Sequence, residues 1–307
     1  MVGRPSGHPY NSDGQRNVGP HAKHVCVPGT SSIRTSEHFV TTTPCGGKKI
    51  WRLGVVSFLN AKPLIEGLEA DPNVRIIHDV PSRLAPMLDD GLVDVALVPV
   101  IDLVQDDRRW KIVSDACIGC DGETLTVRIF SRVPPDSIRR LHIDGDSHTS
   151  VALARILWRE LYDRELEMLP FEGDETVDDC QAVLLIGDKV VNNTLIDYNI
   201  ETDLGSAWKS LTSLPFVFAV WAAPRDLDLA GLAARLSLAR DAGVASAELI
   251  AADYGPGLNW PIVLAKRYLT KRLKFSMGPR ERLGLAKFFE LARKHGLVQS
   301  TQEVVFA

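Results

Sequence analysis

Residues 50–64 read IWRLGVVSFLNAKPL, and this stretch decides the fold class. Its apolar beginning predicts a buried strand that runs into a turn, and Pro63, whose φ angle is preset, suits the first turn of a helix. Further along, we expect a strand at 74–80, a helix that ends near residue 89, and a buried strand at 94–100. This alternation of strands and helices predicts an α/β fold with a largely parallel sheet.

The rest of the sequence continues the alternation and then becomes helical. Strands are expected at 111–117, 124–131, 141–144, 166–171, 182–186 and 214–223. Helices are expected at 149–163, 203–211, 227–240, 245–254, 260–273 and 279–295. Two unequal α/β units joined by apolar strands indicate two lobes with a cleft between them, and such clefts bind small molecules.

We expect three parts along the chain. Residues 1–48 contain 22 Gly, Pro, Ser or Thr residues without helical or strand periodicity, which predicts a disordered N-terminal extension. One lobe is expected to combine 49–137 with 217–307, and the other to comprise 138–216. We also expect the lobes to close over a ligand, because hinged two-lobed proteins sequester ligands in this way.

Charge and hydrophobicity exclude several classes of function. The 307 residues include 35 Lys or Arg and 39 Asp or Glu, so the net charge of −4 gives no broad cationic surface for nucleic acid or anionic lipid. The longest apolar stretch, 216–223, is much shorter than the roughly 20 residues that cross a bilayer, and the N-terminus lacks a secretory pattern. We therefore expect a cytoplasmic protein with a small-molecule ligand, and the sequence makes no prediction of its oligomeric state.

The cysteines do not indicate a metal or redox centre. Their odd number, five, favours reduced thiols over a disulfide framework. Cys117 and Cys120 have CxxC spacing, but no second Cys or His pair accompanies them, and they close an apolar strand rather than begin a helix. No glycine pattern matches a nucleotide-binding fingerprint. The sequence thus predicts neither a metal nor a cofactor.

The junction at 57–64 is the first candidate for ligand binding. It lies where a predicted strand gives way to a helix, the edge at which α/β folds place ligands. Ser57 and Asn60 offer polar side chains there, and Lys62 is interpreted as a solvated surface residue. Two interpretations of Asn60 remain open: its side chain either caps the helix or presents an amide to a ligand.

The junction at 145–150 is the second candidate. Ser147, Thr149 and Ser150 lie at the start of a predicted helix, where they either cap it or, together with free backbone N–H groups and the positive helix end, bind a carboxylate or phosphate. His148 is a possible base, although a single loop histidine is usually not one.

Two later segments add candidates of a different kind. Gly187 ends a predicted strand and allows a ligand to approach the backbone closely, while Asp188 is interpreted as a structural cap. Phe216 lies on the predicted crossing strand, where core packing explains most of the aromatic residues.

Taken in order, several segments resemble one protein family: SFLNAKPL at 57–64, CDGETLTV at 120–127, DSHTSVALARIL at 146–157, LLIGDKV at 184–190 and DLGSAWKSLTSLPFVFAVWAA at 203–223. The chain is similar, over about residues 52–297, to the chorismate dehydratases of the futalosine route to menaquinone. The resemblance implies a two-lobed type II periplasmic-binding-protein-like fold with a central ligand cleft.

The resemblance also implies roles for individual residues. Asn60 matches an asparagine that contacts the substrate, and Thr126 stands where relatives have a serine that lines the site, so the hydroxyl is kept. These two are the expected catalytic residues. The expected substrate-binding residues are Ser57, Ser147, Thr149, Ser150, Gly187 and Phe216.

The implied reaction is the removal of water from chorismate to give 3-[(1-carboxyvinyl)oxy]benzoate, without a cofactor. Such a hydro-lyase must orient the substrate and stabilise charge as the C3 proton and C4 hydroxyl leave. The candidate residues include no convincing Glu, Asp or Lys base. We therefore hypothesise that the enolpyruvyl carboxylate of the substrate takes the proton and that Asn60 orients it.

Two alternatives remain open at this stage. One is a solute-binding protein that captures a small carboxylate without turning it over, because most relatives of such a fold only bind solutes. The other is the related 1,4-dihydroxy-6-naphthoate synthase, which would be expected to place a catalytic histidine in the cleft. His148 is the candidate for that role.

Overall fold

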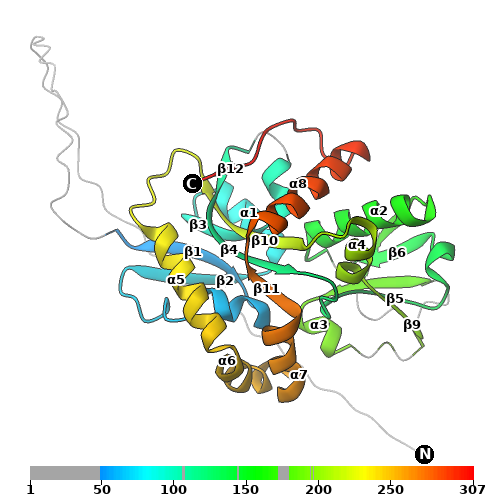
Figure 1. Ribbon diagram of the computed structural model, residues 1–307, viewed down its shortest axis with the longest axis horizontal. Coiled ribbons are helices and arrows are strands. Elements are labelled where there is room, and N and C mark those ends of the chain that lie inside the picture. The colour runs from blue at the N-terminus through cyan, green and yellow to red at the C-terminus, as the bar shows by residue number, and fades with distance from the viewer. Residues whose placement is uncertain (1–48, 106–107, 144, 172–179, 194, 196) are drawn as a thin grey trace, which may run out of the picture. The chain divides into compact units, whose positions relative to one another are not determined.

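The computed structural model describes residues 49–105, 108–143, 145–171, 180–193, 195 and 197–307 (Figure 1). The expected N-terminal extension, 1–48, lies outside the described residues. The described strands form two separate sheets, one of seven strands and one of five. Helices pack around both, so the predicted α/β class is confirmed.

The seven-stranded sheet contains the two ends of the described chain. Its strands are β1 (Trp51–Val56), β2 (Val74–Asp79), β3 (Val95–Pro99), β4 (Trp110–Cys120), β10 (Phe216–Pro224), β11 (Leu273–Ser276) and β12 (Val305–Phe306). The order is β11-β4-β10-β3-β1-β2, and β12 pairs with β4. β1 runs parallel to β2 and β3, as the alternating sequence predicted, whereas β10 inserts antiparallel between β3 and β4.

The five-stranded sheet is built from the middle of the chain. Its strands are β5 (Val127–Ser131), β6 (Arg140–Ile143), β7 (Glu167–Pro170), β8 (Ala182–Ile186) and β9 (Ile200–Asp203), in the order β7-β6-β8-β5-β9. We expected 127–131 in the first lobe, but β5 pairs with β8 and β9. The strands of both sheets are rich in apolar residues, so the composition of residues 127–131 does not indicate which sheet they join. We propose a lobe boundary between β4 and β5 in place of the one after residue 137.

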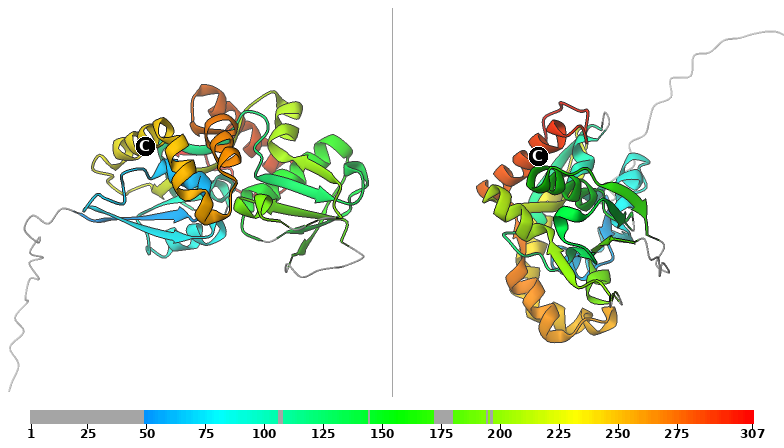
Figure 2. Two further views of the ribbon diagram at one scale, coloured as in Figure 1. Left: turned by 90° about the horizontal axis from the view of Figure 1, so that it is seen from below. Right: turned by 90° about the vertical axis from the view of Figure 1, so that its right-hand side faces the viewer.

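The helices lie mainly around the sheets (Figure 2). The α-helices are α1 (Pro81–Asp89), α2 (His148–Tyr162), α3 (Asp188–Val191), α4 (Leu204–Thr212), α5 (Leu232–Ala245), α6 (Ala247–Tyr254), α7 (Ile262–Arg267) and α8 (Pro279–Lys294). The 3-10 helices are η1 (Leu59–Leu64), η2 (Val100–Val104), η3 (Pro135–Ser137) and η4 (Pro256–Leu258), and η5 (Tyr268–Arg272) is a π-helical turn.

One expected helix is interrupted. We predicted a continuous helix over 260–273, but the chain forms α7, turns through η5 and then enters β11. β11 has four residues and pairs antiparallel with β4. A strand this short carries too little periodicity to be recognised. The interruption matters because the π-helical turn η5 places Tyr268 at the cavity between the two sheets.

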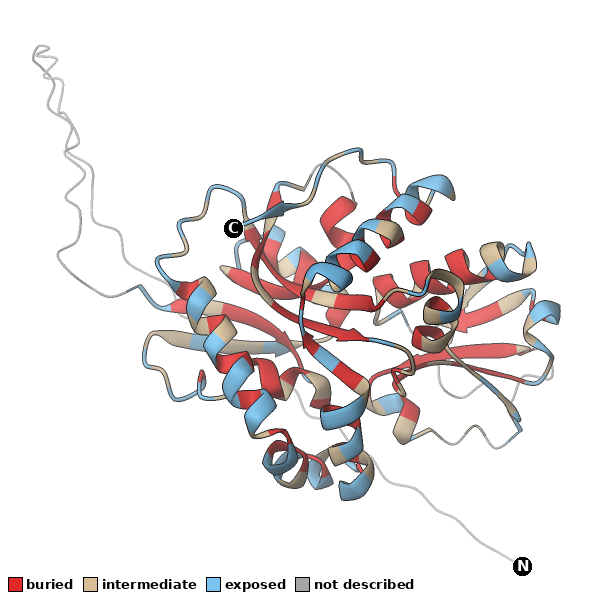
Figure 3. Cartoon of the chain, viewed as in Figure 1, coloured by how far each residue is buried: buried red, intermediate tan, exposed pale blue. Residues whose placement is uncertain are grey.

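Apolar residues of both sheets contribute to one large core (Figure 3). Strands β3 and β8 are buried along their whole length, which explains why each appears as a continuous apolar run. A second, smaller cluster includes Phe130, Val183 and Leu185. Side chains of β5 and β8 therefore pack on both faces of the five-stranded sheet, as Ile129 and Leu184 belong to the large core.

Candidate active site

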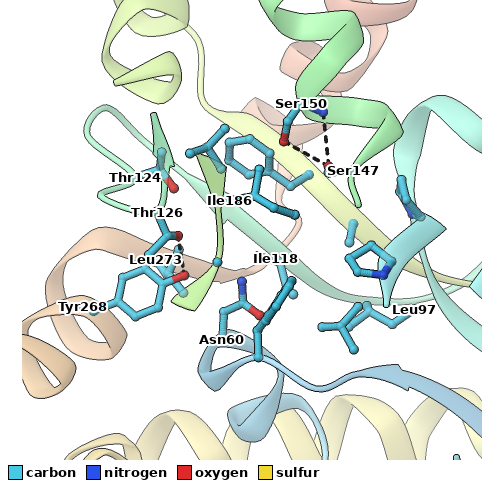
Figure 4. A pocket seen from close by; sticks show the side chains of 18 residues that line it. Asn60, Leu97, Ile118, Thr124, Thr126, Ser147, Ser150, Ile186, Tyr268 and Leu273 are labelled. Carbon is cyan, nitrogen blue, oxygen red and sulfur yellow. Dashed lines mark hydrogen bonds between the residues drawn. The ribbon is translucent and has the colours of Figure 1, made fainter. Parts of the chain in front are cut away.

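A cavity of about 530 Å³, including the solvent at its mouth, lies between residues of the two sheets (Figure 4). One side, the apolar wall, consists of Val56, Phe58, Asn60, Pro81, Leu97, Pro99, Ile118, Phe218, Ala219, Tyr268 and Leu273. The other side, the hydroxyl wall, consists of Thr124, Thr126, Val127, Ser147, Ser150, Ile186 and Gly187. No residue of either wall carries a charged side chain.

Asn60 presents an unsatisfied oxygen atom at the cavity. It is the second residue of η1, whose N-cap is Phe58, so the alternative in which Asn60 caps the helix is wrong. Its Oδ1 atom is buried and has no hydrogen-bond partner among the described residues. Because a buried acceptor without a donor costs free energy, a ligand that donates a hydrogen bond here would be favoured.

Thr126 and Tyr268 form a buried hydroxyl pair where the two walls meet (Figure 4). Their oxygen atoms are 2.6 Å apart, and either hydroxyl can be the donor. Burial raises the pKa of Tyr268, while the polar side chains of Thr126 and Asn60 act in the opposite direction. The phenol therefore keeps its proton at neutral pH. Trp260 stacks on its ring at 4.8 Å and holds its plane.

The segment before β5 is fixed by one carboxylate. Asp203 accepts hydrogen bonds from the backbone N–H groups of Thr124 and Leu125, at 3.0 and 2.8 Å. Leu125 has a φ of 71°, a conformation that non-glycine residues rarely adopt and that needs such support. Asp203 also caps α4 through the N–H of Ser206. The carboxylate thus holds the strained residue that lies between Thr124 and Thr126.

Ser147 and Ser150 line the cavity at the beginning of α2. Ser147 caps the helix, because its oxygen accepts the N–H of Ser150 at 3.3 Å, and its own hydroxyl donates to the Ser150 oxygen at 3.0 Å. The capping interpretation is therefore correct for Ser147, which also lines the cavity, and the binding of an anion there stays a prediction. The positive end of a 15-residue helix beside two hydroxyl groups favours an anionic ligand group.

Gly187 joins the cavity at a point where the two walls touch. Its φ is 59°, and an added Cβ would lie 2.8 Å from the ring of Phe58. Glycine is needed both for this backbone conformation and for the close contact. The sequence prediction of a close backbone approach is therefore correct in its geometry, although the group that approaches is the side chain of Phe58.

Three expected site residues do not line the cavity. Ser57 is exposed and borders a different surface hollow, with Lys62 and Tyr254, because the chain turns after β1. Thr149 is buried and its oxygen accepts the N–H of Ile101. Phe216 is buried and packs edge-on against Trp208 and Phe288, while Phe218 of the same strand lines the cavity instead.

His148 also lies outside the cavity. Its Nδ1 atom is 2.9 Å from the carboxylate of Asp102, which is fully buried. This hydrogen bond raises the pKa of His148. The imidazole borders a separate surface hollow with Gln105 and Arg155. The structure therefore gives His148 a contact with η2 rather than a place beside the ligand.

The cysteine pair is unsuited to nucleophilic or metal chemistry. Cys117 and Cys120 are buried in β4, and burial raises the pKa of both thiols well above the usual range. Among the residues that the structure describes, no three His, Cys, Asp or Glu side chains cluster as a metal site would require. Within the same residues, no helix is long and apolar enough to span a membrane.

Sequence reasoning missed Tyr268 and most of the apolar wall. Leu97, Ile118 and Phe218 belong to buried strands, where an apolar residue at a cavity is indistinguishable from one in the core. Tyr268 was included in a predicted helix without a role. A π-helical turn marks many functional sites, but no pattern in the sequence announces it.

The chain is similar in sequence to proteins of menaquinone biosynthesis. A family model described as menaquinone biosynthesis matches residues 51–294. A chorismate dehydratase of Thermus thermophilus is 28% identical over 261 residues, which cover 78% of this chain and 93% of the relative.

Solved structures share the fold at low identity. A protein of Archaeoglobus fulgidus superposes with a TM-score of 0.62 at 17% identity, covering 81% of this chain and 98% of its own. The periplasmic aliphatic sulphonate binding protein SsuA of Escherichia coli gives 0.58 at 13% identity, covering 84% and 96%. The two-lobed periplasmic-binding-protein-like fold is thereby confirmed.

Proposed function

The chain belongs to the menaquinone biosynthesis family, and from this premise we propose that it is a chorismate dehydratase. The reaction removes water from chorismate to give 3-[(1-carboxyvinyl)oxy]benzoate. The observation that carries the proposal is a cavity whose lining residues are uncharged and in which apolar side chains lie beside hydroxyl groups and one amide. A small ring with two carboxylates and one hydroxyl matches both walls.

The ring of the substrate would pack against the apolar wall. Leu97 and Ile118 supply apolar contact near Asn60, and Leu273 supplies it near Tyr268 (Figure 4). Ser147, Ser150 and the first turn of α2 would hold a carboxylate on the opposite side. Held at both ends, the substrate is oriented for elimination, which removes much of the entropic cost of reaching the transition state.

In the proposed mechanism, a carboxylate of the substrate removes the proton from C3. Among the residues that the structure describes, no Asp, Glu, Lys or His side chain lines the cavity, so the two walls as described offer no ordinary base. The enolpyruvyl carboxylate takes the C3 proton, the C–H electron pair forms the new ring double bond, and the C4–O bond breaks with its electrons on the leaving oxygen. The proton and the leaving hydroxide together make the released water, so no proton is gained or lost overall.

Asn60 acts on the carboxylate that takes the proton, and Thr126 acts on the hydroxyl that leaves. The Asn60 amide orients the enolpyruvyl carboxylate. Its unpartnered Oδ1 also accepts the hydrogen bond of the carboxylic acid that forms when the proton is taken. Thr126, backed by the protonated Tyr268, donates to the oxygen that departs from C4.

Incubation of the purified protein with chorismate, without added cofactor, tests the proposal directly. Ultraviolet absorbance and mass spectrometry should detect an aromatic product lighter by one water. If chorismate is unchanged but raises the melting temperature, the protein is a solute-binding protein. If neither effect occurs, the substrate of the naphthoate synthase is the next to test, although the placement of His148 beside Asp102 disfavours that activity.

We also propose that the protein is cytoplasmic. The reaction needs a small-molecule substrate and no macromolecular partner. Both follow from the balanced charge and from the short apolar stretches of the sequence. Fractionation of cells that express the tagged full chain tests the location.

A further inference from the structure

Asp188 is a partly buried carboxylate that accepts hydrogen bonds from two N–H groups in other parts of the chain. Its Oδ1 atom accepts the indole N–H of Trp260 at 2.9 Å and the backbone N–H of Leu59 at 3.3 Å, and Oδ2 lies 3.4 Å from the same backbone nitrogen. No ion pair to Asp188 is found among the described residues. The two N–H groups therefore carry the interaction.

The bond to Leu59 replaces a missing helix cap. Leu59 begins η1, and its N-cap, Phe58, has no side-chain hydrogen bond to the helix. Asp188 follows β8 of the five-stranded sheet, whereas η1 follows β1 of the seven-stranded sheet. A residue of one lobe thus caps the helix of the other lobe that carries Asn60. Gly187 permits this approach, because any side chain there would strike Phe58.

The hydrogen bond to Trp260 connects Asp188 with the Thr126–Tyr268 hydroxyl pair. Trp260 stacks on Tyr268 with an angle of 19° between the rings, and Tyr268 is 2.6 Å from Thr126. One carboxylate therefore fixes both the start of η1 and the ring against which Tyr268 rests.

We propose that Asp188 is a positioning residue that sets Asn60 and the Thr126–Tyr268 pair in their working geometry when the two lobes are together. This inference rests on the proposed dehydratase function. Asp188 acts through hydrogen bonds as an acceptor and takes no proton from the substrate, because it is not part of either wall of the cavity. Asp188 does not cap its own helix, because the N-cap of α3 is Gly187 and that helix has no side-chain cap; its carboxylate instead accepts the first N–H group of η1 in the other lobe.

Two substitutions at this position separate positioning from proton transfer. Asp188→Ala removes both acceptors, and we expect kcat to fall roughly 10- to 100-fold with a KM change below about threefold. In Asp188→Asn the remaining amide oxygen can still accept from Trp260 and Leu59, so most of the lost kcat should return. If Asp188→Asn is as inactive as Asp188→Ala, or if Asp188→Ala keeps its kcat, the proposal is wrong.

Trp260→Phe gives a second approach if Asp188→Ala does not fold. It keeps a ring for Tyr268 but removes the indole N–H, and we expect a kcat decrease smaller than that of Asp188→Ala. Glu248→Gln is a matched control, because it converts an exposed carboxylate that pairs with Lys266 and should leave kcat unchanged. An unchanged kcat in Trp260→Phe would contradict the route through Tyr268.

Hydrogen exchange provides a readout that does not depend on turnover. Mass spectrometry of peptides that cover residues 57–66 should show faster exchange in Asp188→Ala than in the wild type, and near wild-type exchange in Asp188→Asn. If the wild type leaves chorismate unchanged, the dehydratase function fails, and this measurement still decides whether Asp188 holds η1. Equal exchange in all three proteins would exclude that role.

Discussion

The two walls of the cavity differ in chemistry and in how the chain builds them. The apolar wall comes mostly from buried strands and offers an amide and a phenol as its polar groups. The hydroxyl wall comes from the segment before β5, the beginning of α2 and the end of β8, where backbone and side-chain donors gather. The contrast teaches that the polar groups of the site come from both lobes: under the proposed function the apolar wall would hold the ring and, through Asn60, the enolpyruvyl carboxylate, whereas the hydroxyl wall would hold the other carboxylate.

The amide on the apolar wall gives the largest expected effect. Asn60→Ala should lower kcat by about 10²-fold while KM changes little, because the amide interacts with the group whose charge changes during the reaction. Steady-state kinetics with chorismate measure both constants. Asn73→Ala is the control, since that amide bonds Asp71 in a distant turn. An unchanged kcat in Asn60→Ala would mean that the polar chemistry lies entirely on the hydroxyl wall.

The contact between the walls gives the next effect. In Gly187→Ala the new methyl group would lie 2.8 Å from the Phe58 ring, and overpacking of this kind costs about 1–3 kcal/mol. We expect kcat/KM to fall about tenfold, because the walls are forced apart. Gly67→Ala is the matched control, since φ is +73° there but no atom lies within 4 Å. If both variants behave alike, backbone strain rather than wall spacing is responsible.

A single hydroxyl group gives the smallest effect. Ser150→Ala should raise KM about fivefold and leave kcat nearly unchanged, because Ser147 and the N-terminus of α2 still hold the carboxylate. Ser246→Ala provides the comparison, since Ser246 precedes α6 without a side-chain cap. A large fall in kcat with constant KM would assign Ser150 to the transition state rather than to substrate binding.

The sequence was sufficient for the fold class and for part of the polar site. Asn60, Ser147, Ser150 and Gly187 were predicted as polar or glycine residues at junctions between elements, and they line the cavity, as does Thr126, which the family resemblance indicated. Their catalytic and binding roles stay predictions. Thr124 and Tyr268 also line the cavity but were not predicted.

The apolar wall and Tyr268 could not be predicted in the same way. A cavity-lining leucine and a core leucine have the same pattern, and only the three-dimensional arrangement separates them. The same limit explains Phe216 and Phe218, which share a strand and pack against each other with ring centroids 4.6 Å apart, although only Phe218 lines the cavity. The sheet partner of β5 was also beyond the pattern, because strand pairing depends on contacts between distant segments.

The insertion of β10 between β3 and β4 bears on how the protein folds as it is synthesised. The five-stranded sheet is complete once Asp203 has left the ribosome, whereas the seven-stranded sheet waits for β10, β11 and β12. Ala219 pairs with Pro99, and the whole five-stranded sheet lies between them in the sequence. Pairing over so long a sequence separation slows folding. Until then β3 and β4 lack the strand that lies between them, so their edges are open during synthesis to pairing with other chains.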